Sequence, residues 1–282
     1  MKLIRFCAEN GEKSESFKPG LLKEDGKIVD LTTIFPDIPD ISRKFFSQGW
    51  VEKTAEIDET GKKMDVHLGC PVADPSKIIC LGKNYKEHAK EGGFDVPEKP
   101  LLFCKTLNTL NGPFDSVEMP RSSGQIDWEV ELAIVIGKQG RRISREQAYD
   151  YIAGYTVMND VSAREAQFAF SQWFRGKSFD GFAPMGPCLV TSDEIKNPHD
   201  LRLTARVNGK TMQDGNTNDM IFQIPAIIEN ISEDITLEPG DIIATGTPSG
   251  VGIFRDPPIV IKAGDTVECE IEDIGKIVNK FV

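Results

Sequence analysis

Two hairpin signals constrain the fold of this chain more than any other feature of its sequence. Asp25-Gly26 lies inside the apolar segment 20–31, and Asn208-Gly209 joins the apolar segments 201–207 and 210–213. Both dipeptides supply the positive φ angles that a tight turn between antiparallel strands requires. Strands joined in this way form antiparallel or mixed sheets, whereas parallel sheets need strands that alternate with helices. The sequence therefore predicts an α+β fold that is mostly β.

The rest of the chain follows the same pattern. Apolar, strand-like segments occur at residues 1–7, 77–81, 128–136, 153–159, 241–245 and 266–272. Helical periodicity is rarer and occurs at residues 40–60, 85–91, 144–151 and 220–231, the last interrupted near Pro225. Residues 69–75 are rich in Gly, Pro and Asp, which is typical of a loop between structural units. We therefore predict a small N-terminal α+β domain at residues 1–70 and a larger domain at residues 71–282.

The charge of the chain excludes several classes of partner. Lys and Arg number 33 and Asp and Glu number 44, so the formal charge is −11, and the isoelectric point is about 4.9. An acidic surface is a poor match for nucleic acid and for anionic membranes. No apolar run approaches the ~20 residues of a membrane span, and residues 1–12 lack the apolar core and cleavage site of a signal peptide. We therefore expect a cytoplasmic protein that binds neither nucleic acid nor membrane.

The cysteines and histidines limit the metal chemistry. The six cysteines are scattered, without a Cys-x-x-Cys pair, which favours reduced, buried structural thiols over a zinc site. Three histidines leave little room for a histidine-rich centre. A metal ion in this protein would therefore be held mainly by carboxylate oxygens.

One strand-like segment carries two carboxylates on the same face. Side chains alternate along a strand, so Glu129 and Glu131 project from the same side, about 6–7 Å apart at Cα. A solvated strand face accommodates such a pair. The following segment, Leu132–Ile136, is apolar enough to be buried, and buried carboxylates need a counter-charge or a metal.

Asp160 follows the strand-like segment 154–159 and supplies a third carboxylate. Asp160 or Ser162 can instead cap a helix that begins at Ala163. As a metal ligand, Asp160 would complete an oxygen set that leaves further positions of Mg²⁺ open for water or substrate.

The short helix predicted at residues 85–91 contains one of the histidines. His88 and Glu91 lie three positions apart, so their side chains are neighbours on a helix. A carboxylate beside an imidazole fixes its tautomer and raises its basicity, as a general base requires. The same spacing also occurs in ordinary surface pairs.

Two further segments, both containing glycine, supply candidate residues for binding a substrate. Lys177 lies in the aromatic segment 173–184, where it can neutralise a substrate carboxylate, donate a proton if its pKa is lowered, or extend along the surface. The segment Thr245–Gly252 is rich in small residues but lacks the Gly-Lys-Ser/Thr ending of a phosphate loop. Its composition favours close approach of the backbone to a small ligand.

Taken in order, these motifs resemble those of the fumarylacetoacetate hydrolase family, over about residues 75–275. The motifs that carry the resemblance are Asn84-Tyr85…His88…Glu91, Asp127–Leu132, Gly154–Gln167, Arg175–Phe179, Val207–Gln213, Pro239–Asp241, Thr245–Gly252 and Gly264-Asp265. Residues 1–70 are similar to the variable N-terminal domain of the acylpyruvase-like and 2,4-diketo-3-deoxy-L-fuconate hydrolase-like bacterial members. Similar sequences also carry the name ureidoglycolate lyase.

The resemblance implies a mixed β-sandwich roll of the fumarylacetoacetate hydrolase C-terminal type, one Mg²⁺ or Mn²⁺ per subunit, and a homodimer. The implied metal ligands are Glu129, Glu131 and Asp160. The implied catalytic residues are His88, Glu91 and Lys177. The residues implied to contact the substrate are Lys83, Tyr85, Gln167 and Thr247. Lys83 stands where the family frequently has Arg, which bears on anion recognition because Lys and Arg are not interchangeable.

The reaction implied first is hydrolysis of a carbon–carbon bond in a β-diketo acid, either an acylpyruvate or a diketo-deoxy-sugar acid. His88, oriented by Glu91, would deprotonate water, and the metal would stabilise the enolate of the product. Residues 92–99 are a candidate lid that orders over the substrate. Three alternatives stay open, which are a 2-oxo acid decarboxylase or isomerase, a ureidoglycolate-type lyase, and a non-catalytic ligand-binding protein of the same fold.

Overall fold

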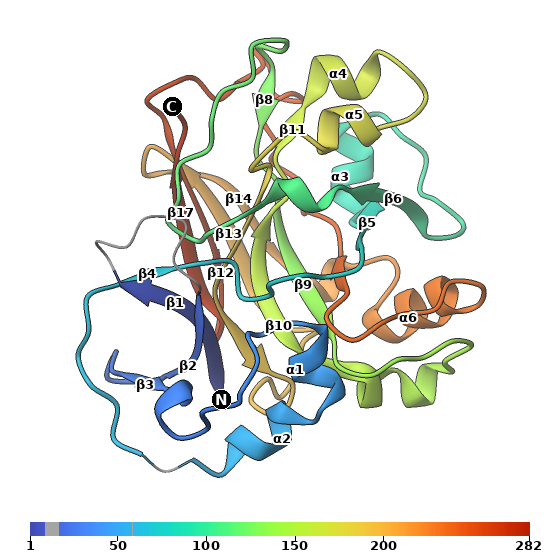
Figure 1. The fold of residues 1–282 in the computed structure, drawn as a ribbon. Helices are drawn as coiled ribbons and strands as arrows, with labels where there is room; N and C mark the ends of the chain where they lie inside the picture. The colour runs from blue at the N-terminus through green and yellow to red at the C-terminus, as the bar shows by residue number, and fades with distance from the viewer. Residues whose placement is uncertain (9–16, 58) are drawn as a thin grey trace.

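Strands dominate the computed structural model, which describes residues 1–8, 17–57 and 59–282. In this part of the chain the strands form an eleven-stranded mixed sheet, a four-stranded antiparallel sheet and a two-stranded ribbon (Figure 1). The α+β, mostly β class predicted from the hairpin signals is confirmed.

The large sheet contains β1 (Lys2–Ala8), β2 (Lys18–Leu22), β3 (Ile28–Asp30), β4 (Val66–Leu68), β5 (Ile78–Gly82), β6 (Leu101–Lys105), β7 (Leu110–Asn111), β9 (Val130–Ile136), β10 (Ile152–Asn159), β12 (Ala183–Thr191) and β15 (Ile242–Ala244). The four-stranded sheet contains β13 (Arg202–Val207), β14 (Lys210–Asn216), β16 (Thr266–Ile271) and β17 (Gly275–Lys280), and the ribbon pairs β8 (Ile126–Asp127) with β11 (Ser162–Ala163). The α-helices are α1 (Arg43–Ser47), α2 (Trp50–Ala55), α3 (Lys86–Glu91), α4 (Arg164–Phe168), α5 (Phe174–Lys177) and α6 (Ile224–Ser232). Short 3₁₀ helices span Leu31–Thr33, Leu107–Thr109, Arg145–Tyr151 and Thr217–Asp219.

Both predicted hairpins form. β2 pairs antiparallel with β3, and Gly26 in their turn has a φ of 76°. β13 pairs antiparallel with β14, and Asn208 and Gly209 between them have φ angles of 50° and 79°. These are the residue types that tolerate positive φ, so the local sequence determines where the chain reverses.

β9 and β10 lie in the middle of the large sheet and lead to the candidate site. The order around them is β1-β12-β10-β9-β15-β5-β6. Leu132 and Ile134 of β9 pack into one core cluster, and Ala133 and Val135 pack into a second cluster. Both faces of β9 are therefore covered, which explains why its sequence is continuously apolar instead of alternating.

The N-terminal segment joins the large sheet. β1 pairs with β12, with Lys2 opposite Val190 and Leu3 opposite Leu189, so the sheet continues across the boundary predicted at residue 70. In Figure 1, α1 and α2 lie at one end of the molecule, and α3, α4 and α5 gather at the other. The division into domains at residues 1–70 and 71–282 stays a prediction.

The single helix predicted at residues 40–60 is wrong in its length. The structure has two short helices, because Gly49 between α1 and α2 adopts a left-handed φ of 68°. Phe45 and Phe46 of α1 are buried in the core, as the helical periodicity predicts. The segment 144–151 likewise forms a 3₁₀ helix instead of an α-helix.

The strands that the sequence reading missed include two long ones, β12 and β17, and the reading misplaced one proline. β12 contains Pro184 and Pro187, which normally argue against a central strand, and β17 follows β16 after a tight turn. Pro225 lies in the first turn of α6, so it begins this helix instead of interrupting it.

Two further expectations concern the membrane and the thiols. Within the described residues, none of the helices combines the length and hydrophobicity needed to span a bilayer. Five cysteines are buried as predicted, but Cys104 on the edge strand β6 is exposed.

Candidate active site

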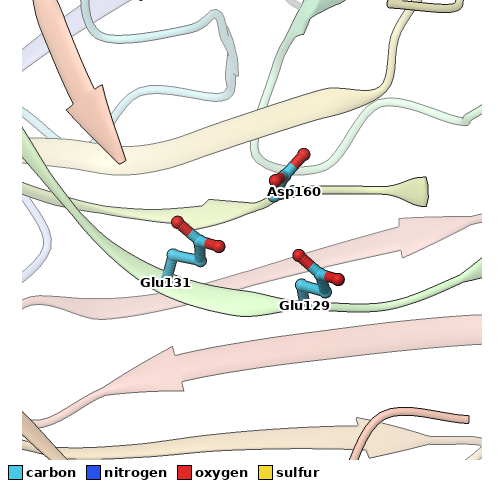
Figure 2. Close-up of side chains that lie close together, drawn as sticks. All are labelled: Glu129, Glu131 and Asp160. Atoms are coloured by element: carbon cyan, nitrogen blue, oxygen red, sulfur yellow. The ribbon is translucent and has the colours of Figure 1, made fainter. Parts of the chain in front are cut away.

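Three carboxylates meet where β9 begins and β10 ends. Glu129 directly precedes β9, Glu131 lies within it, and Asp160 directly follows β10. The two strands are antiparallel, with Met158 opposite Glu131, so the start of one lies beside the end of the other. One oxygen from each carboxylate lies within 4.8 Å of the other two, and Figure 2 shows the three side chains directed into the same space. All three residues are buried. We call these residues the carboxylate triad.

Two members of the carboxylate triad are paired with buried cations. Lys177 Nζ donates to Glu129 Oε2 and to Asp160 Oδ2, at 2.7 Å each. Glu129 Oε1 lies 2.7 Å from Arg164 Nη2. Asp160 Oδ1 accepts a hydrogen bond of 2.6 Å from Lys105 Nζ. Every oxygen of Glu129 and Asp160 therefore has a cationic partner.

The third member is different. Glu131 Oε2 accepts a hydrogen bond of 2.9 Å from the backbone N–H of Gly246, and no described cation lies at ion-pair distance from it. Burial, together with the charges of Asp160 and Glu129, raises the pKa of Glu131 well above its usual value. Burial opposes ionisation of Glu129 too, but Lys177 and Arg164 outweigh burial and lower the pKa of Glu129 to about 2. Glu131 is thus the carboxyl group that lacks a counter-charge.

The carboxylate triad fits a divalent metal ion. Its donor atoms are all carboxylate oxygens, the ligands that suit Mg²⁺ and Mn²⁺. A buried carboxylate without a counter-charge is costly, and a divalent cation would supply the charge that Glu131 lacks. The structure therefore supports a metal site here.

The helix-cap alternative for Asp160 is wrong. α4 begins at Arg164 after Ala163, and none of the described side chains caps its N-terminus. The alternative of a solvated face for Glu129 and Glu131 is wrong as well, because the exposed fractions are only 5% and 1%.

The predicted histidine–glutamate pair lies beside the carboxylate triad. His88 Nδ1 is 2.8 Å from Glu91 Oε1, and Glu91 Oε2 accepts a hydrogen bond of 2.8 Å from the backbone N–H of Gly250. His88 is only 8% exposed, which distinguishes this pair from a surface pair. Because Glu91 binds Nδ1, the other ring nitrogen, Nε2, is the one left for a substrate.

The glycine-containing loop after β15 binds carboxylates of the site itself. Its backbone N–H groups reach Glu131 through Gly246 and Glu91 through Gly250. Gly246 has a φ of 98°, and a Cβ atom there would lie 2.8 Å from Cβ of Asn84. Only glycine fits this position. The close backbone approach predicted for this loop therefore serves to hold the two glutamates in place.

Asp127 ties the same loop to the core. Its Oδ1 accepts from the backbone N–H of Gly252 at 2.7 Å, and its Oδ2 accepts from Ile253 at 3.0 Å. Arg164 Nε donates to Asp127 Oδ2 at 2.9 Å. Asp127 and Arg164 thus join the loop to Glu129.

A small cavity lies among these groups. Its volume is about 30 Å³, room for one or two water molecules. Its lining includes the predicted residues Lys83, His88, Glu129, Glu131, Gln167, Lys177 and Thr247, together with Leu81, Gly82, Arg164 and the aromatic residues Phe94, Phe103, Phe168, Trp173 and Phe254. Glu91 and Asp160 do not line the cavity, but they contact His88 and Lys177, which do.

Aromatic side chains close this cavity. Phe94, in the lid segment predicted at residues 92–99, contacts Phe254 with ring centroids 5.9 Å apart. Lys83 Nζ lies 3.9 Å from the centroid of the Phe94 ring, a cation–π contact. Because the cavity has room for only one or two water molecules, we expect lining side chains to shift when a substrate enters. That the lid orders on binding stays a prediction.

Of the residues predicted to contact the substrate, Gln167 and Thr247 line the cavity and Tyr85 does not. Gln167 Oε1 accepts from Arg164 Nη1 at 2.9 Å, and Thr247 Oγ1 donates to the backbone oxygen of Val130 at 2.9 Å. Both are therefore fixed in the wall of the cavity. Tyr85 does not line it, and its buried hydroxyl has no hydrogen-bond partner among the described residues.

One proposed role of Lys177 is not supported. The sequence analysis allowed for a proton donor with a lowered pKa. Burial does oppose the charge of Lys177, but Asp160 and Glu129 outweigh burial and raise the pKa. The ammonium group is therefore kept charged.

Sequence reasoning missed Arg164, Lys105, Asp127 and Phe254 as parts of the site. Arg164 and Asp127 stand inside the quoted motifs, so those motifs contained a signal. Lys105 had none, because its partner Asp160 is 55 positions away along the chain.

The family follows from a comparison with known proteins. A model of the fumarylacetoacetate (FAA) hydrolase C-terminal family matches residues 77–282. The chain belongs to this family.

Two curated relatives cover most of the chain. Oxaloacetate tautomerase fahd2, mitochondrial, from Xenopus laevis is 42% identical over 293 residues, which cover 100% of this chain and 90% of that protein. Oxaloacetate tautomerase FAHD2A, mitochondrial, from Homo sapiens is 43% identical over 267 residues, which cover 91% of this chain and 84% of that protein.

Solved structures confirm the fold. Fumarylacetoacetate hydrolase from psychrophilic Exiguobacterium antarcticum has a TM-score of 0.85 and 37% identity, and covers 100% of this chain and 99% of that one. 5-Carboxymethyl-2-hydroxymuconate delta-isomerase from Mycobacterium smegmatis has a TM-score of 0.78 and 32% identity, with coverage of 100% and 98%. Maleylpyruvate hydrolase from Sphingobium sp. SYK-6, in complex with manganese (II) ion and pyruvate, has a TM-score of 0.78 and 31% identity, with coverage of 100% and 99%.

These comparisons support an enzyme of the family and change two expectations. The relatives are named as tautomerases, which favours the isomerase alternative over carbon–carbon bond hydrolysis. The relatives are also described as mitochondrial, so the cytoplasmic location expected from the sequence is wrong on this comparison.

Proposed function

We propose that this chain catalyses the keto–enol tautomerisation of a 2-oxo dicarboxylic acid, with oxaloacetate as the first candidate. The observation that carries the proposal is the buried His88–Glu91 pair beside the carboxylate triad. The names of relatives that are 42% and 43% identical support this reaction over others of the family.

The reaction requires one proton to move at carbon and one at oxygen. His88 Nε2 takes a proton from the carbon next to the 2-oxo group, and the electron pair of that bond forms the carbon–carbon double bond of the enol. Negative charge develops on the 2-oxo oxygen, which then receives the proton from the imidazolium of His88, directly or through a water molecule, so that the neutral base is restored. No water is consumed and no carbon–carbon bond breaks. Glu91 holds the imidazole in the tautomer that leaves Nε2 free.

The carboxylate triad would hold one Mg²⁺ or Mn²⁺. When bound, such an ion supplies Lewis-acid stabilisation of the charge that develops on oxygen. The aromatic residues Phe94 and Phe254 exclude bulk water, which strengthens every electrostatic interaction inside the cavity.

The charges around the cavity favour an anionic substrate. Four buried carboxylates, the carboxylate triad and Asp127, face three buried cations, Lys105, Arg164 and Lys177, which leaves one negative charge. A divalent ion would change this balance to one positive charge, and the charges of Lys83 and Glu91 beside the cavity offset each other. The site with its metal ion would therefore carry a net positive charge, which matches an anion.

Hydrolysis of an acylpyruvate is the second candidate. Its support is the fold shared with hydrolases from Exiguobacterium antarcticum and Sphingobium sp. SYK-6. In that case His88 would deprotonate water instead of carbon.

A direct assay separates the two candidates. Oxaloacetate enol and an acylpyruvate are supplied in turn with Mg²⁺ or Mn²⁺, and loss of enol absorbance is followed together with release of pyruvate. We expect rapid conversion of the oxaloacetate enol without pyruvate. Release of pyruvate from the acylpyruvate, with no acceleration of enol conversion, would support the hydrolase instead.

The homodimer implied by the family resemblance remains a proposal. Phe168, Phe170 and Phe174 are 47%, 70% and 48% exposed, and apolar surface of this kind suits a second copy of the chain. Size-exclusion chromatography with light scattering tests it, and a monomer at all concentrations would rule it out.

A further inference from the structure

The partners of the carboxylate oxygens divide into two kinds. Lys105 and Arg164 bind the outer oxygens, Asp160 Oδ1 and Glu129 Oε1. Lys177 alone binds two members of the carboxylate triad, through Glu129 Oε2 and Asp160 Oδ2. A metal ion bound by all three carboxylates would use these two oxygens together with Glu131, because Lys105 and Arg164 hold the other oxygens of Asp160 and Glu129.

Lys105, Arg164 and Lys177 also differ in their other contacts. Lys105 also donates to the backbone oxygen of Val161 at 3.2 Å and does not line the cavity. Arg164 is held by Asp127 as well. Among the described hydrogen bonds of its side chain, Lys177 has only the two to the triad, and it lines the cavity. Arg164 lines the cavity too, but Lys177 is the cation that hydrogen-bonds the triad alone, with the centroid of the Phe103 ring 5.1 Å from its Nζ.

We propose that Lys177 is a tethered cation that competes with the divalent metal for Glu129 and Asp160, and that metal binding releases its ammonium group into the cavity. The inference rests on the metal site of the proposed function and adds an exchange between two cations. Both cations need the same carboxylate oxygens, and like charges at that separation repel strongly in a buried site.

The exchange has two consequences. Lys177 neutralises the carboxylate triad before the metal arrives, which limits the cost of burying the carboxylates, and it weakens metal affinity by occupying the ligands. After release, the ammonium group faces the cavity, where a substrate carboxylate is the nearest new partner. Metal binding therefore prepares the site for the anion.

Removal of the tethered charge tests the proposal. Lys177→Met keeps most of the side-chain volume without the ammonium group. Mn²⁺ binding is measured by calorimetry at about pH 8, where unpaired carboxylates are ionised. We expect the Kd of Lys177→Met to be lower than that of the unaltered protein by about tenfold or more. An unchanged or higher Kd overturns the proposal.

Lys83→Met is the matched control for long-range charge. Lys83 lines the same cavity and carries the same charge, but it contacts Phe94 instead of the triad. We expect its Mn²⁺ Kd to stay within about threefold of the unaltered protein. An equal gain in both variants means that net charge, not competition for the ligands, sets the affinity, and this overturns the proposal. If the unaltered protein binds no Mn²⁺, the metal-dependent function itself fails, which is a distinct result.

A second measurement on the unaltered protein does not depend on how the variant folds. The ammonium groups of Lys105 and Lys177 are both buried, so nitrogen-15 NMR of lysine side chains should detect both as slowly exchanging. Saturating Mg²⁺ should abolish the protection of one signal and leave the other. Persistence of both signals overturns the proposal.

Discussion

The two hollows at opposite ends of β9 and β10 differ in size and in chemistry. The cavity at the carboxylate triad has a volume of about 30 Å³. A groove at the other end, lined by residues of α1 and α2 and by Gly137 and Ile152, has a volume of about 840 Å³. The larger hollow contains charged residues, but Glu52, Lys53, Lys138 and Asp150 are all exposed. Solvated charges interact weakly, whereas the buried charges around the cavity cannot avoid one another. The site is therefore identified by buried charge and not by volume.

Substitutions at the cavity and at the groove should differ most in their effect on turnover. His88→Asn removes the proposed base and should lower kcat for enol conversion by about 10²- to 10⁴-fold. His199→Asn is the control, because His199 Nε2 lies 2.8 Å from the hydroxyl of Tyr149, a residue of the groove. Its kcat should match that of the unaltered protein. Equal loss in both variants would contradict the assignment of chemistry to the cavity.

Metal binding should depend on the carboxylate triad and not on the groove. Glu131→Gln removes the carboxylate that lacks a counter-charge, so Mn²⁺ affinity should fall by about a hundredfold or more. The rise in Tm on addition of Mn²⁺ should disappear with it. Glu52→Gln in the groove should keep both properties. Calorimetry and thermal scans measure them, and a Glu131→Gln protein that still binds Mn²⁺ tightly would remove Glu131 from the ligand set.

The buried cations should matter more for stability than the exposed ones. Lys105→Met leaves Asp160 without one of its two cationic partners, and breaking a buried ion pair in this way costs about 3–5 kcal/mol. Lys138→Met, at the groove, should change the free energy of unfolding by less than about 0.5 kcal/mol. Urea unfolding gives both values. A small effect at Lys105 would mean that Lys177 alone suffices for Asp160.

The smallest expected effect concerns thiol reactivity. Cys104 on β6 is exposed, and burial raises the pKa of both Cys70 and Cys188 to about 11. An aromatic disulfide reagent at neutral pH should therefore modify Cys104 alone in the native protein, because the thiolate is the reactive form. Cys104→Ser should then show no rapid reaction. Rapid modification of a second thiol would indicate that the core opens more readily than the structure implies.

Local patterns in the sequence predicted much of the fold. Asp25-Gly26 and Asn208-Gly209 located two hairpins because positive φ is a property of single residues. The helix predicted at residues 40–60 was too long. Apolar residues recur with the helical period on both sides of Gly49, so the pattern did not show that the helix ends there. β12 escaped detection because its prolines argue against a strand, although its neighbours in the sheet are β1 and β10.

In the candidate site, too, local sequence predicted some contacts, and the pairing of distant strands decided others. The spacing of His88 and Glu91 predicted a contact that the structure contains, because neighbours on a helix are set by its geometry. The side chains of Glu129 and Glu131 were placed on one face by the two-residue period of a strand. Their burial, and the arrival of Asp160 beside them, depended on the antiparallel pairing of β9 with β10.

The sequence by itself therefore determined the fold class, the family and the residue types of the site, because these follow from local periods and from the order of motifs. Only the tertiary structure decided which charges meet. Lys105, Arg164 and Lys177 come from separate segments, and no local pattern links them to the carboxylates that they bind. Long-range pairing in a buried environment is a property of the packed chain, and it distinguishes Glu129, which has two cations beside it, from Glu131, which has none among the described residues.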